Sequence, residues 1–350
     1  MTLVAQPEVF IRLPHSMCAA SVTGVLQVAD AAESLGFDGV SVQDQLLQGR
    51  GTAPCGHFHD GDDRDIFEPL ATLTFVAART SRIKLVTGVI VLPFRHVVQL
   101  AKQAGTLDVL SNGRLVLGVG IGWPGARTTD VAQRMSHYAD VARRESELFD
   151  VPSPRPKLMD EALQALHLLW TEDVASFHGD LISFDGVDLR PQPVQKPRPP
   201  IWVGGRAEAV QRRAALYADG WFPSQATVAL IRAGRELMLP IAEAAGRPEP
   251  RFAVNIFLSI DEDGNAARDV LRDGLGARFK TPEQLADATI SGTPGEVIAR
   301  IREYMAAGVS AFDLKLLPPT TEGMLSTMDL LARDLLPALK SEHQTSTVTA

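Results

Sequence analysis

The sequence predicts an α/β fold, a (β/α)8 TIM barrel with insertion loops at the carboxyl-end face of its strands. Three observations predict it: buried strands alternate with amphipathic helices, the strands number eight, and 350 residues exceed the roughly 250 typical of this fold. An open doubly wound sheet is the alternative. The alternation continues through the whole chain, which favours the closed barrel.

The clearest unit runs from Ile83 to Trp123. Its first strand, 83–92, is an apolar run typical of a parallel strand buried on both faces. Helix 97–110 follows with its apolar residues on one stripe, and strand 115–119 is again apolar. Three glycines accompany the end of that strand: Gly118, Gly120 and Gly122. They lie at the carboxyl end of a strand, where α/β folds bind their ligands.

The same signals recur elsewhere along the chain. Before this unit, strand 9–13 is apolar, helix 22–35 has an apolar stripe and ends at Gly36, and strand 37–42 follows. Apolar runs predict the remaining strands at 201–203, 220–222, 252–260 and 311–316. Helical spacing predicts the remaining helices at 67–79, 157–170, 207–217, 228–245 and 294–307.

Three insertions separate these elements, at 44–65, 124–156 and 181–199. The first two follow strand ends, so we expect them to form walls or a lid at the barrel mouth. Within the third, residues 181–196 predict a short β excursion. We expect residues 1–340 to form one domain and the polar tail 341–350 to be disordered.

Composition limits the classes of function. A formal net charge of -8 and the lack of a basic stripe argue against nucleic-acid binding. Cys18 and Cys55 are the only cysteines, so a disulfide framework is not expected. No apolar run approaches the roughly 20 residues that span a bilayer, and the first residues show no signal-peptide pattern. We therefore expect a cytoplasmic protein that does not bind membranes.

Several blocks of the chain, over most of residues 22–222, resemble the luciferase-like monooxygenases and their deazaflavin-dependent relatives. The blocks read LGFDGVSVQD at 35–44, PLATLTFVAARTSRIKLVTGVIVLP at 69–93, LAKQAGTLDVLSNGRLVLGVGIGW at 100–123, SFHGDLISFDGVDLRPQPVQKPRPPIWVGG at 176–205 and ADGWF at 218–222. The HGD, RPPIWVGG and DGWF sequences are most similar to the branch of probable coenzyme F420-dependent oxidoreductases. The resemblance implies a (β/α)8 barrel, a homodimer, and a flavin-like ring bound at the carboxyl ends of the strands.

Gly204, Gly205, Arg206 and Ala207 follow a buried strand and open a helix. The free N–H groups of a helix N-terminus bind phosphate, and an arginine there adds a charge-assisted bond. We predict that these residues hold the cofactor phosphate. A tight strand-to-helix turn that binds nothing is the alternative.

The resemblance also assigns Thr87, Gly88 and Val89 to the cofactor site. Relatives have at this place a bulge with a non-proline cis peptide, which presses against the face of the ring, and the corresponding bond here is Gly88-Val89. A glycine tolerated at an ordinary β-bulge is the alternative. Gly120 and Gly122 are predicted to face the cofactor as well.

Four residues are candidates for the chemistry: Asp44, Gln45, His15 and Trp123. Asp44 corresponds to the aspartate of an Asp-His pair common in the family, and Gln45 stands where the histidine would be. In the sugar-phosphate dehydrogenases of the family a glutamate occupies about the place of Trp123. Neither Gln45 nor Trp123 can act as a general base, so oxidation of sugar phosphates is not expected. Both side chains either contact cofactor or substrate or pack at the barrel rim, and His15 is either a site residue or structural.

The loop from Cys55 to Asp65 is rich in possible metal ligands. Its spacing matches neither a zinc pattern nor the calcium loop, so we predict an acidic lid and no metal site.

These observations lead to three hypotheses about function. The first is an oxidoreductase that uses reduced coenzyme F420 to transfer hydride to a small organic substrate. The second is a two-component monooxygenase of the same family, which receives reduced FMN from a separate reductase. The third is a flavin-binding barrel that has lost catalysis, which the missing histidine at Gln45 keeps open.

Overall fold

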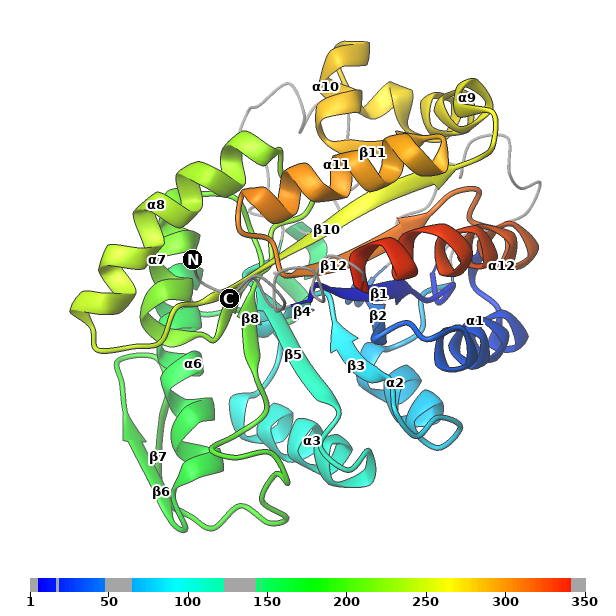
Figure 1. Ribbon diagram of the computed structural model, residues 1–350. Coiled ribbons are helices and arrows are strands. Elements are labelled where there is room, and N and C mark those ends of the chain that lie inside the picture. The colour runs from blue at the N-terminus through cyan, green and yellow to red at the C-terminus, as the bar shows by residue number, and fades with distance from the viewer. Residues whose placement is uncertain (1–5, 17–18, 48–64, 123–142, 146, 341–350) are drawn as a thin grey trace, which may run out of the picture.

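The computed structural model describes residues 6–16, 19–47, 65–122, 143–145 and 147–340. Parallel strands form a closed barrel, and helices surround it (Figure 1). The eight positions around the barrel follow the order β1, β2, β3, β5, β8, β9, β10 and β12, and pairing of β12 with β1 closes the ring. The predicted (β/α)8 barrel is confirmed.

The barrel strands are β1 (Glu8–Arg12), β2 (Gly39–Val42), β3 (Lys84–Thr87), β5 (Leu115–Gly120), β8 (Ile201–Val203), β9 (Gly220–Trp221), β10 (Arg251–Ile260) and β12 (Ala311–Leu316). Each pairs in parallel with its neighbours, for example Phe10 with Gly39 and with Asp313. The predicted single strand 83–92 is wrong in one respect. It is broken after Thr87, and the short strand β4 (Ile90–Val91) then pairs with β5 before a 3-10 turn, η3 (Leu92–Phe94).

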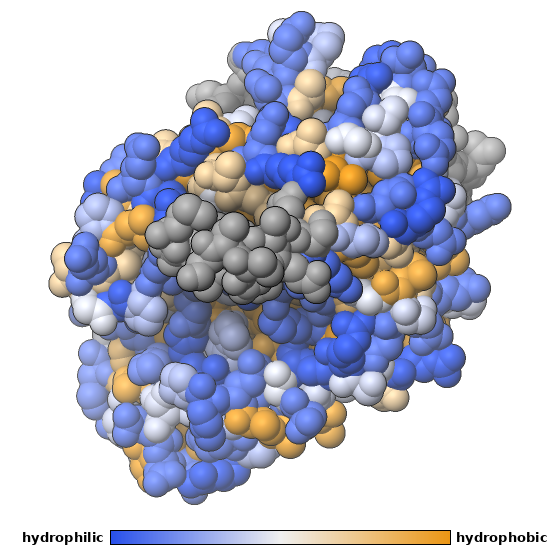
Figure 2. All heavy atoms as spheres, viewed as in Figure 1, coloured by the Kyte–Doolittle hydropathy of each residue, from blue (hydrophilic) through white to orange (hydrophobic). Residues whose placement is uncertain are grey.

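The helices are α1 (Val22–Leu35), α2 (Pro69–Ala77), α3 (Val97–Leu110), α6 (Arg155–Thr171), α7 (Glu208–Tyr217), α8 (Val228–Ala244) and α11 (Pro294–Ala306). Local chemistry explains their ends. The Ser21 hydroxyl accepts a hydrogen bond from the Gly24 N–H at the start of α1, and Gly36 ends that helix in the left-handed region at φ 89°. In this view the outer faces of the helices are predominantly hydrophilic (Figure 2), as expected for helices that bury one face against the barrel.

Several elements differ from the prediction. The β excursion begins earlier than predicted, as a hairpin of β6 (Ala175–His178) and β7 (Ser183–Val187) beside α6. The segment after β10, for which the sequence reading named no element, contains α9 (Gly264–Leu275), η4 (Gly276–Arg278), α10 (Pro282–Asp287) and β11 (Thr289–Gly292). After β12 come α12 (Thr321–Leu330) and a π-helical turn, η5 (Leu331–Leu335), which the sequence reading also missed.

The long strand β10 explains the position of the inserted β11. Near its start, Phe252 of β10 pairs with Trp221 of β9. Further along the same edge, Phe257 to Ile260 pair with β11. The carboxyl half of β10 therefore extends past β9, and α9, η4 and α10 stand above the barrel at this side (Figure 1).

Side chains fill the barrel interior in layers. At the amino ends of the strands Glu8 is ion-paired with Lys84 and with Arg251. Above them lies an apolar layer of Phe10, Val86, Val116, Trp202, Phe222, Ala253 and Ala311. The next layer toward the carboxyl ends is polar, which is unusual for a packed core and marks the functional end of the barrel. Among the described residues no helix is long and apolar enough to cross a membrane.

Candidate active site

The polar layer is organised around Asp313, whose side chain is fully buried. Its carboxylate accepts hydrogen bonds from Arg12 Nη2 at 2.5 Å, from the Asn255 amide and from the Ser41 hydroxyl. These residues come from β12, β1, β10 and β2, so one carboxylate connects four strands. A buried charge requires such partners, because unpaired burial costs several kcal/mol.

Arg12 connects this network to the bulge in the third strand. Its Nη2 also donates to the Gly88 carbonyl at 3.0 Å. The other two guanidinium nitrogens, Nε and Nη1, are buried and have no hydrogen-bond partner among the described residues. Buried arginine donors without partners are costly, and in the described part of the chain Arg12 keeps two unsatisfied donors beside the bulge.

The bulge itself has the geometry that the resemblance predicted, because the Gly88-Val89 peptide bond is cis. The Gly88 N–H donates to the Val42 carbonyl at 2.6 Å, and the Thr87 hydroxyl donates to the Gly118 carbonyl at 2.8 Å. Thr87 is fully buried, and its hydrogen bond to Gly118 links β3 to β5. Contact of these residues with a cofactor stays a prediction.

Val89 lies over three glycines, Gly118, Gly120 and Gly204, which we call the glycine seat. A Cβ atom at Gly120 would lie 2.9 Å from Val89 Cγ2, and one at Gly204 would lie 3.0 Å from Val89 Cγ1. At Gly118 a Cβ would also meet the Thr87 carbonyl oxygen at 2.0 Å. Any larger residue would therefore displace Val89. The glycines place a partly exposed isopropyl group at the carboxyl ends of β5 and β8.

The predicted phosphate loop lies beside the glycine seat. Gly205 has φ 129°, which favours glycine, and its carbonyl accepts a 2.7 Å hydrogen bond from the Trp221 indole. Arg206 and Ala207 are exposed, and Ala207 is the N-cap of α7, not its first helical residue as predicted. No side chain caps α7 there, so side chains leave its first N–H groups accessible to a ligand.

Asp44 and Gln45 have local partners. The Asp44 carboxylate is fully buried and accepts from Arg95 Nη2 at 2.8 Å and from the Val91 N–H at 2.9 Å. Burial raises its pKa, and Arg95 partly offsets this effect. Gln45 donates to the Leu47 carbonyl at 2.8 Å. In the structure Asp44 therefore holds the end of β4 against the loop after β2.

His15 is fully buried, and both of its ring nitrogens contact backbone. Nδ1 lies 2.9 Å from the Leu13 carbonyl, and Nε2 accepts from the Gln43 N–H at 3.0 Å. Burial, with a contribution from the neighbouring Arg12, lowers the pKa of His15 to about 4, so the ring is neutral at pH 7. These contacts join the ends of β1 and β2.

The remaining predicted residues have different outcomes. Trp123 and all of the acidic loop except Asp65 lie outside the described residues. Gly122 has φ 74°, and a Cβ there would meet Val91 at 2.7 Å. Within the described ranges there is no group of three or more histidine, cysteine, aspartate or glutamate residues able to hold a metal ion.

The sequence reading missed Arg12, Asn255, Asp313 and Lys315. A usable signal was present, because alternation along AFDLKL places Ala311, Asp313 and Lys315 on one face of β12. Ala311 packs in the apolar layer inside the barrel, so Asp313 and Lys315 face inward too. Two charges on the interior face of a barrel strand indicate a functional site.

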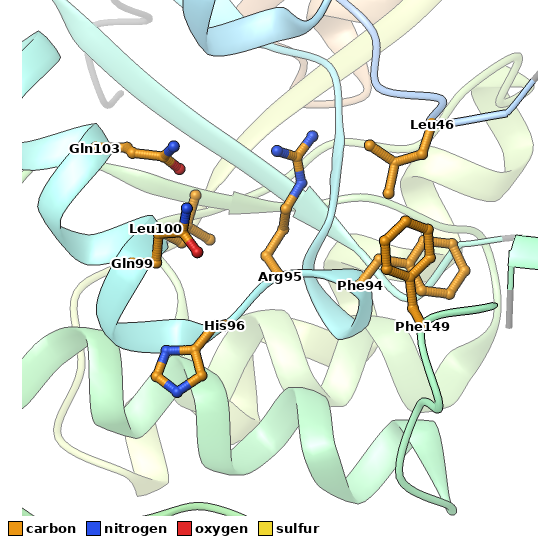
Figure 3. Close-up of a pocket in the computed structure, with 8 residues that line it drawn as sticks. All are labelled: Leu46, Phe94, Arg95, His96, Gln99, Leu100, Gln103 and Phe149. Atoms are coloured by element: carbon orange, nitrogen blue, oxygen red, sulfur yellow. The ribbon is translucent and has the colours of Figure 1, made fainter.

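A separate pocket of about 160 Å³ lies outside the barrel, where η3 meets α3 (Figure 3). Phe94 and Phe149 stack on one side with ring centroids 5.8 Å apart, and His96, Gln99 and Gln103 line the other. Arg95 stands between them but is already paired with Asp44 and Glu68.

Comparison with known proteins decides the family. A family model described as luciferase-like monooxygenase matches residues 6–280. The chain belongs to this family. Its members include oxidoreductases and monooxygenases, so the coarse class of function follows from membership.

Three similar proteins illustrate the range within the family. An uncharacterized protein of Mycobacterium tuberculosis is 28% identical over 264 residues, covering 72% of this chain and 82% of that protein. The FMNH2-dependent dimethylsulfone monooxygenase of Pseudomonas putida is 28% identical over 196 residues, 56% of this chain and 50% of the relative. The coenzyme F420-dependent tetrahydromethanopterin reductase of Methanopyrus kandleri shares the fold with a TM-score of 0.72 and 18% identity, covering 96% of this chain and 100% of that structure.

Proposed function

We propose that the protein is an oxidoreductase that uses reduced coenzyme F420 to transfer hydride to a small organic substrate. The observation that supports it best is the glycine seat. It presents the Val89 side chain at the carboxyl ends of β5 and β8, next to the uncapped N-terminus of α7. A flat ring with a phosphate-bearing tail matches an apolar contact surface adjacent to a phosphate-binding turn.

The residues fit such a cofactor. Gly204 and Gly205 allow the backbone to approach the ligand closely, and Arg206 adds an exposed positive charge at the N-terminus of α7. Glu208 would oppose a phosphate, but its carboxylate turns along the helix to Arg212 at 2.7 Å. When bound, reduced F420 supplies the hydride, while the protein supplies orientation, exclusion of water and polarity.

A second candidate is a monooxygenase that receives reduced FMN from a separate reductase. The named activity of the Pseudomonas putida relative supports it, and a flavin ring would occupy the same place over Val89. The first candidate rests on the similarity of the HGD, RPPIWVGG and DGWF sequences to the F420-dependent branch. The two candidates differ in the reaction with dioxygen, since deazaflavin lacks the ring nitrogen that supports it.

The test is a titration of the purified protein with F420, reduced F420, FMN and reduced FMN, in which binding is measured by fluorescence and by calorimetry. We expect saturable binding of F420 in both redox states. Arg206→Gln should weaken it about tenfold, the worth of one charge-assisted bond. The matched control is Arg232→Gln, at an exposed arginine of α8.

Each outcome has a distinct meaning. Preference for reduced FMN would replace the proposal with the monooxygenase. Binding without turnover of any tested substrate would favour the inactive flavin-binding barrel. If none of the four compounds binds, all three hypotheses fail.

A further inference from the structure

Three positively charged side chains lie near one another at the carboxyl end of the barrel, two of them against the ring of Phe257. The Lys315 ammonium is 4.8 Å from the ring centroid, and the Arg278 guanidinium carbon is 5.8 Å from it. Arg12 completes the group from β1, with its two buried nitrogens unpartnered among the described residues. We call these three residues the cationic cluster.

The strand register explains why the cluster forms. Phe257 of β10 is the direct partner of Lys315 of β12, and Asn255 is the partner of Asp313. Asp313 points into the barrel, so Lys315, two residues further along, points the same way one layer higher. Arg278 comes from η4, in the insertion that stands above this side of the barrel.

Asp313 is the negative charge that faces the cluster, and its hydrogen-bonding capacity is already used. Its oxygens accept from Arg12 Nη2, Asn255 and Ser41. Lys315 has no carboxylate within ion-pair distance among the described residues. Burial lowers the pKa of Lys315 to about 7. Arg12 and Arg278 contribute to this lowering, and Asp313 opposes it. The cluster therefore carries an excess of positive charge in a site that is only partly exposed to water.

The cluster lies across the barrel from the expected phosphate site. In the ring of eight positions, β8 with its glycines stands opposite β1, β12 is next to β1, and β10 lies midway between β8 and β1. A cofactor anchored at α7 with its ring over Val89 would have Arg12 beside the Gly88–Val89 bulge, while Lys315 on β12 would lie away from its phosphate. The cluster is therefore placed to bind a substrate, not the cofactor phosphate.

We propose that the cationic cluster is a substrate subsite that binds an oxyanion, so that the substrate of this enzyme is an organic acid anion. The reaction that the bound substrate undergoes rests on the proposed function, whereas the binding of an anion to the cationic cluster does not. Lys315 contacts the anionic group from the barrel interior, Arg278 contacts it from the β10–β11 insertion, and the buried Arg12 adds its positive charge beneath them. Carboxylates and phosphate monoesters share this chemistry.

The experiment measures binding to the purified full-length protein without cofactor, by calorimetry, with benzoate, phenyl phosphate and benzamide as probes. Benzamide has the shape of benzoate without its charge. We expect benzoate or phenyl phosphate to bind at least tenfold more tightly than benzamide, and the tighter of the two identifies the class of oxyanion. Lys315→Gln should weaken anion binding about tenfold at pH 6.5.

The matched control is Lys196→Gln, which makes the same change at an exposed lysine in the segment before β8, at the amino end of the barrel. It should leave binding unchanged. Arg278→Gln, at a partly exposed site, provides a second variant whose folding does not depend on the barrel interior.

The pH dependence separates charge binding from a purely structural role of Lys315. The lysine loses its proton as pH rises through about 7, so benzoate affinity should fall about tenfold between pH 6 and 8.5. In Lys315→Gln this dependence should disappear. The charged groups that act on Lys315 are Arg12, Arg278 and Asp313.

Three results would overturn the inference: equal binding of benzamide and benzoate, equal effects of Lys315→Gln and Lys196→Gln, or displacement of benzoate by whichever cofactor binds. Failure here with normal cofactor binding would leave the proposed function intact. Anion binding to the cluster without any cofactor binding would reject the proposed function and keep the subsite.

Discussion

Replacing Asp313 by asparagine is the perturbation that most sharply tests the polar layer inside the barrel. The substitution keeps the size of the side chain and removes its charge. Arg12 would then keep a buried positive charge without its counter-ion, because Asp313 is its ion-pair partner at 2.5 Å with side-chain exposures of 8% and 0%. The Asn255 amide and the Ser41 hydroxyl would compete for one remaining acceptor oxygen.

The expected cost follows from these contacts. Removal of one partner of a buried ion pair costs about 3–5 kcal/mol, because the remaining charge stays buried. The asparagine oxygen still accepts one hydrogen bond, so we expect about 3 kcal/mol for Asp313→Asn and about 4 kcal/mol for Asp313→Leu. Against a total stability of roughly 5–15 kcal/mol, either loss is large.

The assay is equilibrium urea unfolding followed by the fluorescence of the buried residues Trp170, Trp202 and Trp221. The control is Asp30→Asn, whose pair with Arg79 is exposed, and it should change stability by less than about 1 kcal/mol. The double variant Arg12→Met, Asp313→Leu removes both charges and should recover most of the loss. If Asp313→Asn equals the control, or if the double variant is no more stable than Asp313→Leu, the reasoning is wrong.

Two further predictions concern His15 and the glycine seat. Burial lowers the pKa of His15 to about 4, so unfolding takes up a proton below pH 6.5 and stability falls as pH drops through that window. Between pH 7.5 and 4.5 the free energy of unfolding of the protein should fall by about 2.5 kcal/mol more than that of His15→Gln. The control His178→Gln, at an exposed histidine, should show the full fall. Equal falls in the two variants would contradict the account. Gly120→Ala places a Cβ 2.9 Å from Val89 and should weaken cofactor binding measurably, while Gly276→Ala, where the nearest atom is 3.6 Å away, should not; equal binding in these two variants would show that the glycine seat does not position the ligand.

Much of the fold was predictable from local signals. Helices α1 and α3 begin and end where the sequence predicted, because their apolar stripes are regular and their ends carry clear signals such as Ser21 and Gly36. Helix α9 was missed although Ala267, Leu271 and Leu275 recur at helical spacing. Three short elements follow one another there, α9, η4 and α10, and their charged residues obscured the helical pattern. Strand β11 is too short to predict without knowing that it pairs with the edge of β10.

The candidate site was predictable where it depends on glycine. Gly118, Gly120 and Gly204 stand out in apolar strands, but their purpose, to make room for Val89, requires the pairing of β3, β4, β5 and β8. The network of Arg12 and Asp313 joins residues about as far apart as the chain allows, and only closure of the barrel brings them together.

The central claim is that a flavin-type ring binds over Val89 with its phosphate at the N-terminus of α7. A crystal structure of the complex with whichever of F420 or FMN binds tests this claim most directly. The account predicts the ring in van der Waals contact with Val89 and phosphate oxygens within hydrogen-bond distance of the backbone N–H groups that follow Gly205. A ring bound elsewhere, such as in the pocket beside Phe94, or a phosphate bound by Lys315 and Arg278, would contradict it.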